Sequence, residues 1–360
     1  MPLKPLGYNS FFEEQIKQLE LTDFDVARVI SEYKGAYKIK DEKGEYLAKI
    51  TGKQMFDASS REDYPAVGDF VVVNKLDNEN AVIKKVLLRK TIIKRKFGDR
   101  NRIGEKSEVQ VIATNIDVAF IVESVDRDYN LNRFERYFAI TENGGVKPAI
   151  ILNKIDLISK EELNEKIDLL KKRFPEADVI LTSVINNEGL DNLIKYIEKE
   201  KTYCFLGSSG VGKSSLINKL LGENTIKTGD VSSYSDRGKH TTTNRQMYFL
   251  TNGGIVIDNP GIREVGITDS NKVSDTFFDE INEFAKDCKY SDCTHIHEPG
   301  CAVIEAVKSG KLDEKKYNNY LNLKREIDYN EMNQLEKRED EKKFGKFIKK
   351  AKKEIEDFWG

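Results

Sequence analysis

The chain has 360 residues, which exceeds the usual size of one hydrophobic core and predicts two or three domains. Its 59 Lys and Arg nearly balance its 61 Asp and Glu, so the protein as a whole is not a basic nucleic-acid-binding protein. The sequence shows neither the apolar core of a signal peptide nor a stretch that approaches a membrane span, so we expect a cytoplasmic protein without a membrane partner.

Residues 1–22 read as a short helical lead-in, and the segment after them is predicted to consist of strands. Between residues 23 and 90, short runs with partial alternation of apolar residues are separated by Gly, Asp and Asn turns. Strands of this kind over roughly sixty residues are typical of a five-stranded OB-fold β-barrel, with a small SH3-like barrel as the alternative. We therefore predict an N-terminal RNA-binding barrel at residues 23–90.

Two stretches of the chain are strongly basic, Lys84–Arg102 and Lys342–Lys353. The first carries nine Lys or Arg against Asp99 alone, and the second carries seven lysines and no acid. Such stretches are expected where a protein binds a phosphate backbone, although either one alone could be a solvated face or a linker. Because they flank the motifs described next, together they favour RNA.

The tetrapeptide Asn153-Lys154-Ile155-Asp156 follows a predicted strand, as a guanine-specificity motif does. The Asp156 carboxylate can accept hydrogen bonds from the ring N–H and the exocyclic amine of guanine, which adenine does not offer. Asn153 offers its amide to the other edge of the base, and the Lys154 stem can pack along the nucleotide. Thr182-Ser183-Val184 resembles the Ser-Ala-type loop that backs the guanine, with valine where alanine is usual.

A phosphate-binding loop of the form Gly-x4-Gly-Lys-Ser lies between a predicted strand at 202–206 and a predicted helix. Its glycines let backbone N–H groups surround the phosphates at the positive end of that helix. We expect Lys213 to reach the β- and γ-phosphates and the Ser214 hydroxyl to bind Mg²⁺. The expected phosphate-site residues are Gly207, Ser208, Ser209, Gly210, Val211, Gly212, Lys213, Ser214 and Ser215.

The order of these two motifs is the most informative feature of the chain. An ordinary small GTPase has the phosphate loop first and Asn-Lys-x-Asp later, whereas here Asn153–Asp156 precedes Gly207–Ser214. A domain can keep its sheet when its termini are joined and the chain is opened elsewhere, because domain termini often lie close together. We therefore predict a circularly permuted α/β P-loop GTPase domain at residues 91–270, which binds GTP and GDP.

Two segments lie where the rotated order places the switch regions. One of Thr241, Thr242 and Thr243 is expected to complete the Mg²⁺ shell and contact the γ-phosphate, and we favour Thr242, which is thereby also a candidate catalytic residue. In Asp258-Asn259-Pro260-Gly261, Asp258 would hold Mg²⁺ through water and the Gly261 N–H would contact the γ-phosphate. Release of this segment after hydrolysis could then move the module that follows it.

The group that orients the attacking water is not the usual one. Many GTPases place a water-orienting Gln after the last glycine, but this chain has Ile262, so intrinsic hydrolysis should be slow. His240 is the candidate catalytic residue because an imidazole can position water and transfer a proton near neutral pH. A structural or RNA-contacting role for His240 is the alternative.

Three of the four cysteines cluster with a histidine as Cys288-x4-Cys293-x-His295-x5-Cys301. Three thiolates and one imidazole form a closed tetrahedral set, which is the composition of structural zinc sites. A cytosolic protein keeps its thiols reduced, so we do not expect these cysteines to form disulfides. His297 is a rival ligand, and a Cys-rich loop without metal is the remaining alternative. We predict a zinc-binding, α-helical C-terminal domain at residues 271–360.

This combination of features resembles the ribosome small-subunit-dependent GTPase A family: a barrel, Asn-Lys-x-Asp, the phosphate loop, Gly-Lys-His-Thr-Thr-Thr, Asp-x-Pro-Gly and the Cys/His cluster. The resemblance spans about Asp25 to Lys311 and favours His295 over His297 as the Zn²⁺ ligand. It implies a factor that acts late in maturation of the small ribosomal subunit, binds the subunit and its rRNA, and hydrolyses GTP faster in its presence.

This sequence departs from the family pattern at a few positions. These departures bear on how the protein contacts its partner more than on GTP hydrolysis. Asn259 stands where Thr is usual, and both the lead-in and the charged tail are long. We expect a monomer. Two other functions stay open: a nucleotide-gated RNA-binding scaffold with incidental hydrolysis, and a regulatory GTPase with a protein partner.

Overall fold

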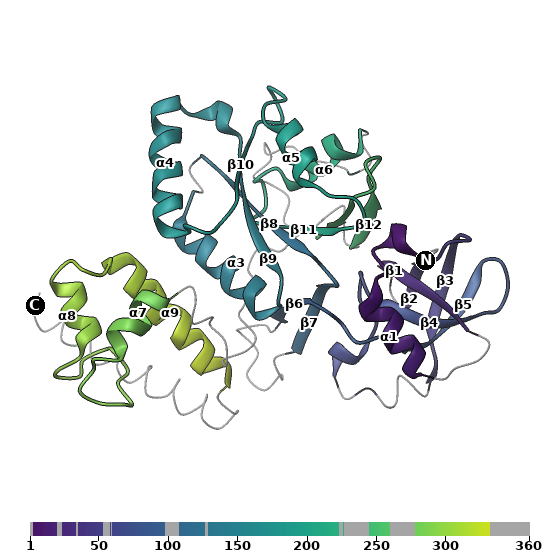
Figure 1. Ribbon diagram of the computed structural model, residues 1–360, viewed down its shortest axis with the longest axis horizontal. Coiled ribbons are helices and arrows are strands. Elements are labelled where there is room, and N and C mark those ends of the chain that lie inside the picture. Colours follow the sequence, from purple (N-terminus) through teal and green to yellow (C-terminus); the bar gives the residue numbers. More distant parts are fainter. Residues whose placement is uncertain are drawn as a thin grey trace, which may run out of the picture. The chain divides into compact units, whose positions relative to one another are not determined.

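The computed structural model describes residues 3–19, 24–33, 35–52, 58, 60–97, 108–126, 129–222, 226, 245–259 and 278–331. The chain divides into two compact units (Figure 1). The first comprises Met1–Lys96 with Glu108–Val265, and the second comprises Phe97–Ser107 with Gly266–Gly360. Within the described ranges, no helix is both long enough and apolar enough to cross a membrane.

The N-terminal strands are β1 (Asp25–Tyr33), β2 (Ala36–Lys40), β3 (Glu45–Ile50), β4 (Phe70–Lys75) and β5 (Asn80–Val86), with the 3-10 helix η2 (Arg61–Asp63) before β4. They form a closed barrel in the order β1-β2-β3-β5-β4, in which β4 pairs back to β1 and only β3 and β5 are parallel. Buried and less buried residues alternate along β2 and β3, as expected for strands with one face inside a small barrel. The predicted OB-type barrel is confirmed.

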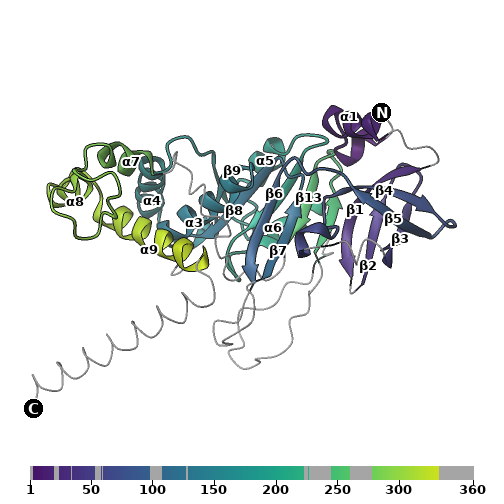
Figure 2. The ribbon, with the colours of Figure 1, turned by 90° about the horizontal axis from the view of Figure 1, so that it is seen from below.

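The N-terminal lead-in packs onto this barrel. It forms the short 3-10 helix η1 (Lys4–Leu6) and α1 (Ser10–Gln18), and α1 packs against the outer side of β1 and β4 (Figure 2). The rings of Phe12 and Phe70 lie 4.4 Å apart between centroids, within an apolar cluster that Tyr8 and Leu87 join. Burial of these aromatic rings stabilises the lead-in on the barrel. The sequence predicted a helix here but not its packing.

A second set of strands forms the sheet of the GTPase domain: β8 (Val118–Ser124), β9 (Lys147–Asn153), β10 (Val179–Thr182), β11 (Thr202–Leu206), β12 (Gln246–Phe249) and β13 (Ile255–Asp258). Their order is β10-β9-β8-β11-β13-β12, and every pair is parallel except β12–β13. Every residue of β8 and β11 is buried, which explains why these strands are nearly continuous apolar runs.

Helices cover both faces of this sheet: α3 (Leu131–Asn143), α4 (Lys160–Arg173), α5 (Leu190–Tyr196) and α6 (Lys213–Leu221), with the 3-10 helix η3 (Ile155–Leu157) after β9. Figure 1 shows α3 and α4 on one side of the strands and α5 and α6 on the other. Leu193 of α5 and Leu216 of α6 are buried with Phe120 and Phe205 of the central strands. The doubly wound α/β architecture agrees with the predicted GTPase domain.

The barrel and the GTPase sheet are joined in one unit. Ser31 of β1 pairs with Gln246 of β12, so the two sheets meet along a short antiparallel contact. A separate ribbon, β6 (Ile92–Phe97) with β7 (Glu108–Thr114), lies between barrel and sheet in the sequence. The Ile92 N–H donates to the carbonyl of Gly144 at 3.0 Å, which ties the ribbon to the end of α3.

The described part of the second unit is helical, as predicted, and contains α7 (Asp279–Ala285), α8 (Ala302–Lys308) and α9 (Glu314–Glu331). Phe278, Ile281 and Leu323 are buried in it, and the Phe278 and Tyr320 rings lie 5.1 Å apart. The basic stretch Lys342–Lys353 lies outside the described residues.

Candidate guanine-nucleotide site and metal centre

The phosphate loop has a backbone that favours glycine at three points. Gly207, Gly210 and Gly212 have φ values of 145°, 87° and 98°. A Cβ on Gly207 would lie 2.2 Å from the Val122 carbonyl oxygen, and one on Gly212 would lie 2.3 Å from the Asn153 amide nitrogen. The glycines therefore let the loop turn tightly at the ends of the central strands and lead into α6.

Lys213 begins α6 and folds over its own loop. Its ammonium donates to the carbonyls of Gly207 at 2.7 Å and Ser208 at 2.6 Å. Burial lowers the pKa of Lys213 to about 8, against the raising effects of Asp258 and Glu123. The lysine is thus placed where a phosphate could replace the two carbonyls as its partner.

Asp258 lies at the end of β13 and is almost wholly buried. Burial raises its pKa to about 6, which Lys213 partly counteracts. Its Oδ1 atom is buried and has no hydrogen-bond donor among the described residues. A buried carboxylate oxygen without a donor, close to the phosphate loop, fits a hydrated Mg²⁺.

Asn153 links the base motif to the phosphate loop. Its amide nitrogen donates to the Val211 carbonyl at 2.8 Å, and its amide oxygen accepts from the Thr182 hydroxyl at 3.0 Å. Both atoms of the amide are therefore used within the protein. The sequence motif correctly predicted that Asn153 lies at the site, but it predicted that the amide faces the base. A linking role could not be read from the motif, because Val211 is 58 residues away.

Asp156 and Lys154 are each tethered by a neighbouring side chain. The Ser183 hydroxyl donates to Asp156 and accepts from the Asn186 N–H at 3.1 Å. Lys154 forms an ion pair of 3.1 Å with Asp126, a residue the sequence analysis missed. The structure thus brings the base motif, Thr182-Ser183 and the phosphate loop to one edge of the sheet, where ligands of open α/β sheets bind.

Of the predicted switch residues, the structure describes Asp258 and leaves the others undescribed. Thr241, Thr242, Thr243, His240 and Gly261 all lie outside the described residues, as does Ile262. Their assignments remain predictions.

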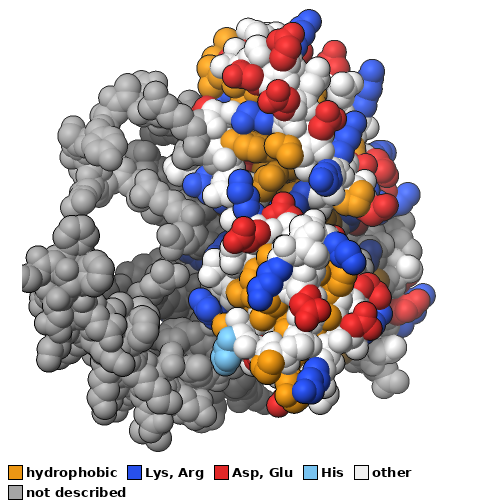
Figure 3. Space-filling model, turned by 90° about the vertical axis from the view of Figure 1, so that its left-hand side faces the viewer, with side chains coloured by type: hydrophobic (Ala, Val, Ile, Leu, Met, Phe, Trp, Pro, Cys, Tyr) orange, Lys and Arg blue, Asp and Glu red, His pale blue; other side chains and the backbone are white. Residues whose placement is uncertain are grey.

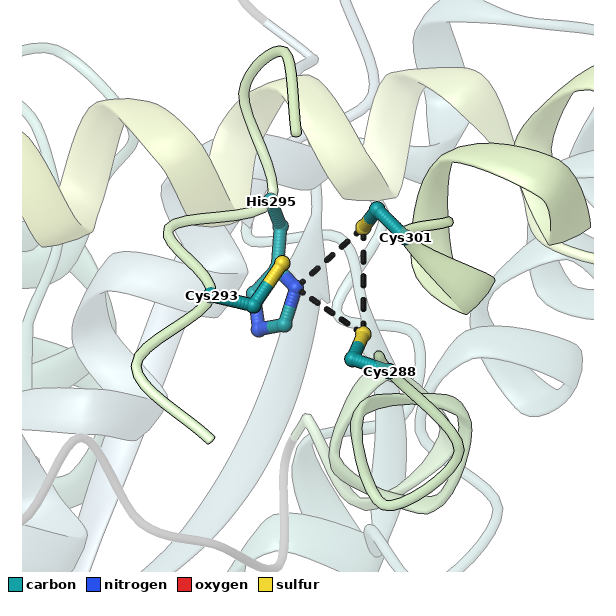
Figure 4. Close-up of side chains that lie close together, drawn as sticks. All are labelled: Cys288, Cys293, His295 and Cys301. Atoms are coloured by element: carbon teal, nitrogen blue, oxygen red, sulfur yellow. Dashed lines mark hydrogen bonds between the residues drawn. The ribbon is translucent and has the colours of Figure 1, made fainter. Parts of the chain in front are cut away.

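The Cys/His cluster is assembled in the second unit, with its side chains turned toward one another (Figure 4). One ligand atom from each of Cys288, Cys293, His295 and Cys301 lies within 4.8 Å of the others. His295 Nδ1 is 3.6 Å from Cys288 Sγ and 3.5 Å from Cys301 Sγ, and the two sulfurs are 3.8 Å apart. Four such atoms could hold one metal ion. His297 is exposed and is not part of the cluster.

The first basic stretch is only partly available to a partner. Arg89 is used within the protein, where it pairs with buried Asp69 at 2.8 Å and donates to two backbone carbonyls. Lys94 lies 3.5 Å from Glu62. Lys84 and Lys85 are exposed. Figure 3 views the left-hand side of Figure 1 and does not show this stretch; on the described residues that it draws, acidic and basic side chains are interspersed rather than grouped by sign.

Comparison with known proteins decides the family. A family model described as RsgA GTPase matches residues 86–268. The chain belongs to the RsgA GTPase family. It is 38% identical over 351 residues to small ribosomal subunit biogenesis GTPase RsgA 1 of Bacteroides thetaiotaomicron, which covers 97% of this chain and 96% of that protein. It is 41% identical over 266 residues to the RsgA of Methanosarcina acetivorans, which covers 74% of this chain and 70% of that protein.

Solved structures agree with this RsgA assignment. The crystal structure of YjeQ from Thermotoga maritima has a TM-score of 0.61 and 26% identity, and the match covers 84% of this chain and 98% of that one. YloQ, described as a circularly permuted GTPase, has a TM-score of 0.58 and covers 86% of this chain and 97% of that one, and at 24% identity it supports the fold alone. The resemblance and the circular permutation inferred from the sequence are confirmed, and the protein is a GTPase.

Proposed function

We propose that the protein is a small-subunit biogenesis factor whose GTP hydrolysis is stimulated by the small ribosomal subunit. The observation that carries the GTP site is the Asn153–Val211 hydrogen bond, because it brings the base motif and the phosphate loop together although their order in the chain is reversed. The ribosomal partner is supported by the names of relatives that match most of the chain.

In the proposed site, each described residue has a defined task. The loop N–H groups of Gly207–Ser214 surround the phosphates, and Lys213 contacts the β- and γ-phosphates. Asp156 accepts hydrogen bonds from guanine, held in place by Ser183. Thr182 holds the Asn153 amide, and Ile155 and Ser215 complete the site.

Mg²⁺ would be held by Ser214, Thr242 and, through water, Asp258. When bound, it neutralises charge that builds up on the phosphate oxygens. The Gly261 N–H contacts the γ-phosphate, and His240 positions the attacking water, because Ile262 offers no polar group for that task.

The metal of the second unit is proposed to be Zn²⁺, held by Cys288, Cys293, His295 and Cys301. A tetrahedron with metal–sulfur bonds of about 2.3 Å has edges of roughly 3.8 Å. The Cys288–Cys301 sulfur separation of 3.8 Å fits that edge. A closed set of four protein ligands leaves no position for substrate, so the ion would be structural.

We propose that the subunit's rRNA contacts the barrel and the two basic stretches. The protein is proposed to act in the cytoplasm as a monomer. Replacing the lysines of Lys342–Lys353 should weaken subunit binding in a salt-dependent manner, because phosphate contacts release counterions.

The deciding experiment is the GTPase rate measured with and without purified small ribosomal subunits. A slow basal rate that rises strongly with small subunits, and not with large subunits, supports the proposal. RNA binding gated by nucleotide without stimulation would favour the scaffold alternative. Stimulation by a protein fraction free of ribosomal particles would favour a regulatory GTPase.

A further inference from the structure

Strands β8 and β9 end side by side, so the residues just beyond them emerge next to each other. The strands are parallel, with Ser124 opposite Asn153, the last residue of each. The Val125 N–H extends this contact by donating to the Asn153 carbonyl at 3.1 Å. Asp126 and Lys154 therefore leave the sheet at the same edge.

The Asp126 carboxylate is held at both oxygens. Oδ2 lies 3.1 Å from the Lys154 ammonium, and Oδ1 accepts a hydrogen bond from the Ser124 hydroxyl at 2.7 Å. The Asp126 carbonyl also accepts from the Tyr129 N–H at 3.0 Å. Because Ser124 is buried at the end of a central strand, the rigid sheet orients the carboxylate.

Lys154 needs such support more than most residues of the site. Its φ of 62° lies in the left-handed region, which is unfavourable for a residue with a Cβ. Its side chain is long and 28% exposed, and a free lysine side chain samples many rotamers. The ion pair with Asp126 limits this freedom and directs the stem along the sheet edge.

We propose that Asp126 is a positioning residue for guanine-nucleotide binding, which fixes the Lys154 stem before the nucleotide arrives. The inference rests on the proposed GTP site, in which that stem packs along the nucleotide. Preorganising a contact removes part of the entropy lost on binding, so it strengthens affinity and leaves the chemical step unchanged. With Asp126 included, each polar residue of the base motif is held by a side chain from outside the motif: Asn153 by Thr182, Lys154 by Asp126 and Asp156 by Ser183.

The test is Asp126→Asn, with GTP and GDP affinities and kcat measured at low and at high KCl. A partly exposed ion pair contributes little, so we expect about a two- to fivefold loss of affinity for both nucleotides at low salt, with kcat unchanged. The loss should shrink as KCl rises, because salt screens the wild-type pair. Asp178→Asn is the matched control. It breaks the 2.8 Å Lys147–Asp178 ion pair at the other end of β9 and should change neither the nucleotide affinities nor kcat.

A double-mutant cycle assigns the effect to Lys154. Lys154→Met keeps an apolar stem and removes the ammonium, so adding Asp126→Asn to it should change affinity no further. Equal affinities of Asp126→Asn and wild type at low salt, or a full effect of Asp126→Asn in the Lys154→Met protein, would overturn the inference. A wild-type protein that binds no GTP would overturn the proposed function instead.

Discussion

Arg28 of the barrel donates a hydrogen bond to the Thr202 hydroxyl at 2.9 Å, and Thr202 is the first residue of the strand that carries the phosphate loop. The same guanidinium donates to the carbonyls of Gly68 at 3.1 Å and Asn115 at 3.0 Å and to that of Leu6. Arg28 is completely buried, and burial lowers its pKa to about 10, so it stays charged at neutral pH. One side chain thus joins lead-in, barrel and GTPase strand.

Replacing Arg28 should therefore loosen this junction. Arg28→Met leaves several buried carbonyls without a donor, so we expect the free energy of unfolding to fall by roughly 3 kcal/mol. Urea unfolding followed by circular dichroism measures the change. Lys43→Met, at an exposed position of the same barrel, is the control and should be nearly neutral. If Arg28→Met and the control unfold at the same urea concentration, Arg28 does not stabilise this junction.

Asp156 should decide which base is bound. Asp156→Asn removes the acceptor for the guanine N–H groups, so GTP affinity should fall roughly 10- to 100-fold. The affinity for xanthine nucleotides should rise, because their extra carbonyl can accept a hydrogen bond from the new Asn amide. Equilibrium binding of both nucleotides measures the switch, with Asp191→Asn on the exposed face of α5 as the control. Unchanged GTP binding would show that Asp156 does not read the base.

Lys213 should make GTP binding depend on pH. In the free protein burial lowers its pKa to about 8, whereas bound phosphates stabilise the ammonium and raise its pKa. Below about pH 8 the lysine is already charged, so it adds no pH dependence. Above that value binding takes up a proton, and affinity should fall by up to about tenfold per pH unit. Calorimetry at pH 9 in buffers of different ionisation enthalpy should detect the uptake, which should vanish at pH 7.

Cys293 should be needed for the metal and not for the nucleotide. Cys293→Ser removes one thiolate of the closed set, so zinc should be lost and the second unit destabilised, because metal binding contributes to folding. GTP affinity should be retained. Elemental analysis of purified protein gives the zinc content, and Cys204→Ala, at a cysteine outside the cluster, should keep it. Wild-type protein without zinc would end this assignment.

His240 should act on the chemical step alone. His240→Ala should lower the subunit-stimulated kcat by about 100-fold or more while GTP affinity changes little. The exposed His297 provides the matched control, and His297→Ala should be stimulated like wild type. If His240→Ala is stimulated as well as wild type, the histidine has no part in catalysis and the scaffold alternative gains support.

Local sequence patterns predicted the parts of the site that are contiguous in the chain. The phosphate loop, the base motif and the Cys/His cluster each have a spacing imposed by their own chemistry, so each could be recognised without knowing the fold. The barrel was predictable because its strands alternate and its turns are marked by Gly, Asp and Asn.

Contacts between distant segments could not be predicted in this way. Arg28 lies in a strand, where a charged residue is ordinarily read as solvent-exposed, and its partner Thr202 is 174 residues away. Asp126 follows β8 without any motif, and only the register of β8 against β9 places it beside Lys154. Arg89 was counted as part of a basic patch, but the fold pairs it with Asp69.

The strand order of the GTPase sheet also has a consequence for synthesis of the chain. Strands β8, β9 and β10 pair with one another and are translated before β11, so the half that reads the base can form first. Until residues 202–206 emerge, the other edge of β8 has no strand to pair with, and it is entirely apolar in sequence from Val118 to Val122. The nascent protein therefore has to keep this edge from pairing with other chains until the phosphate loop has been synthesised.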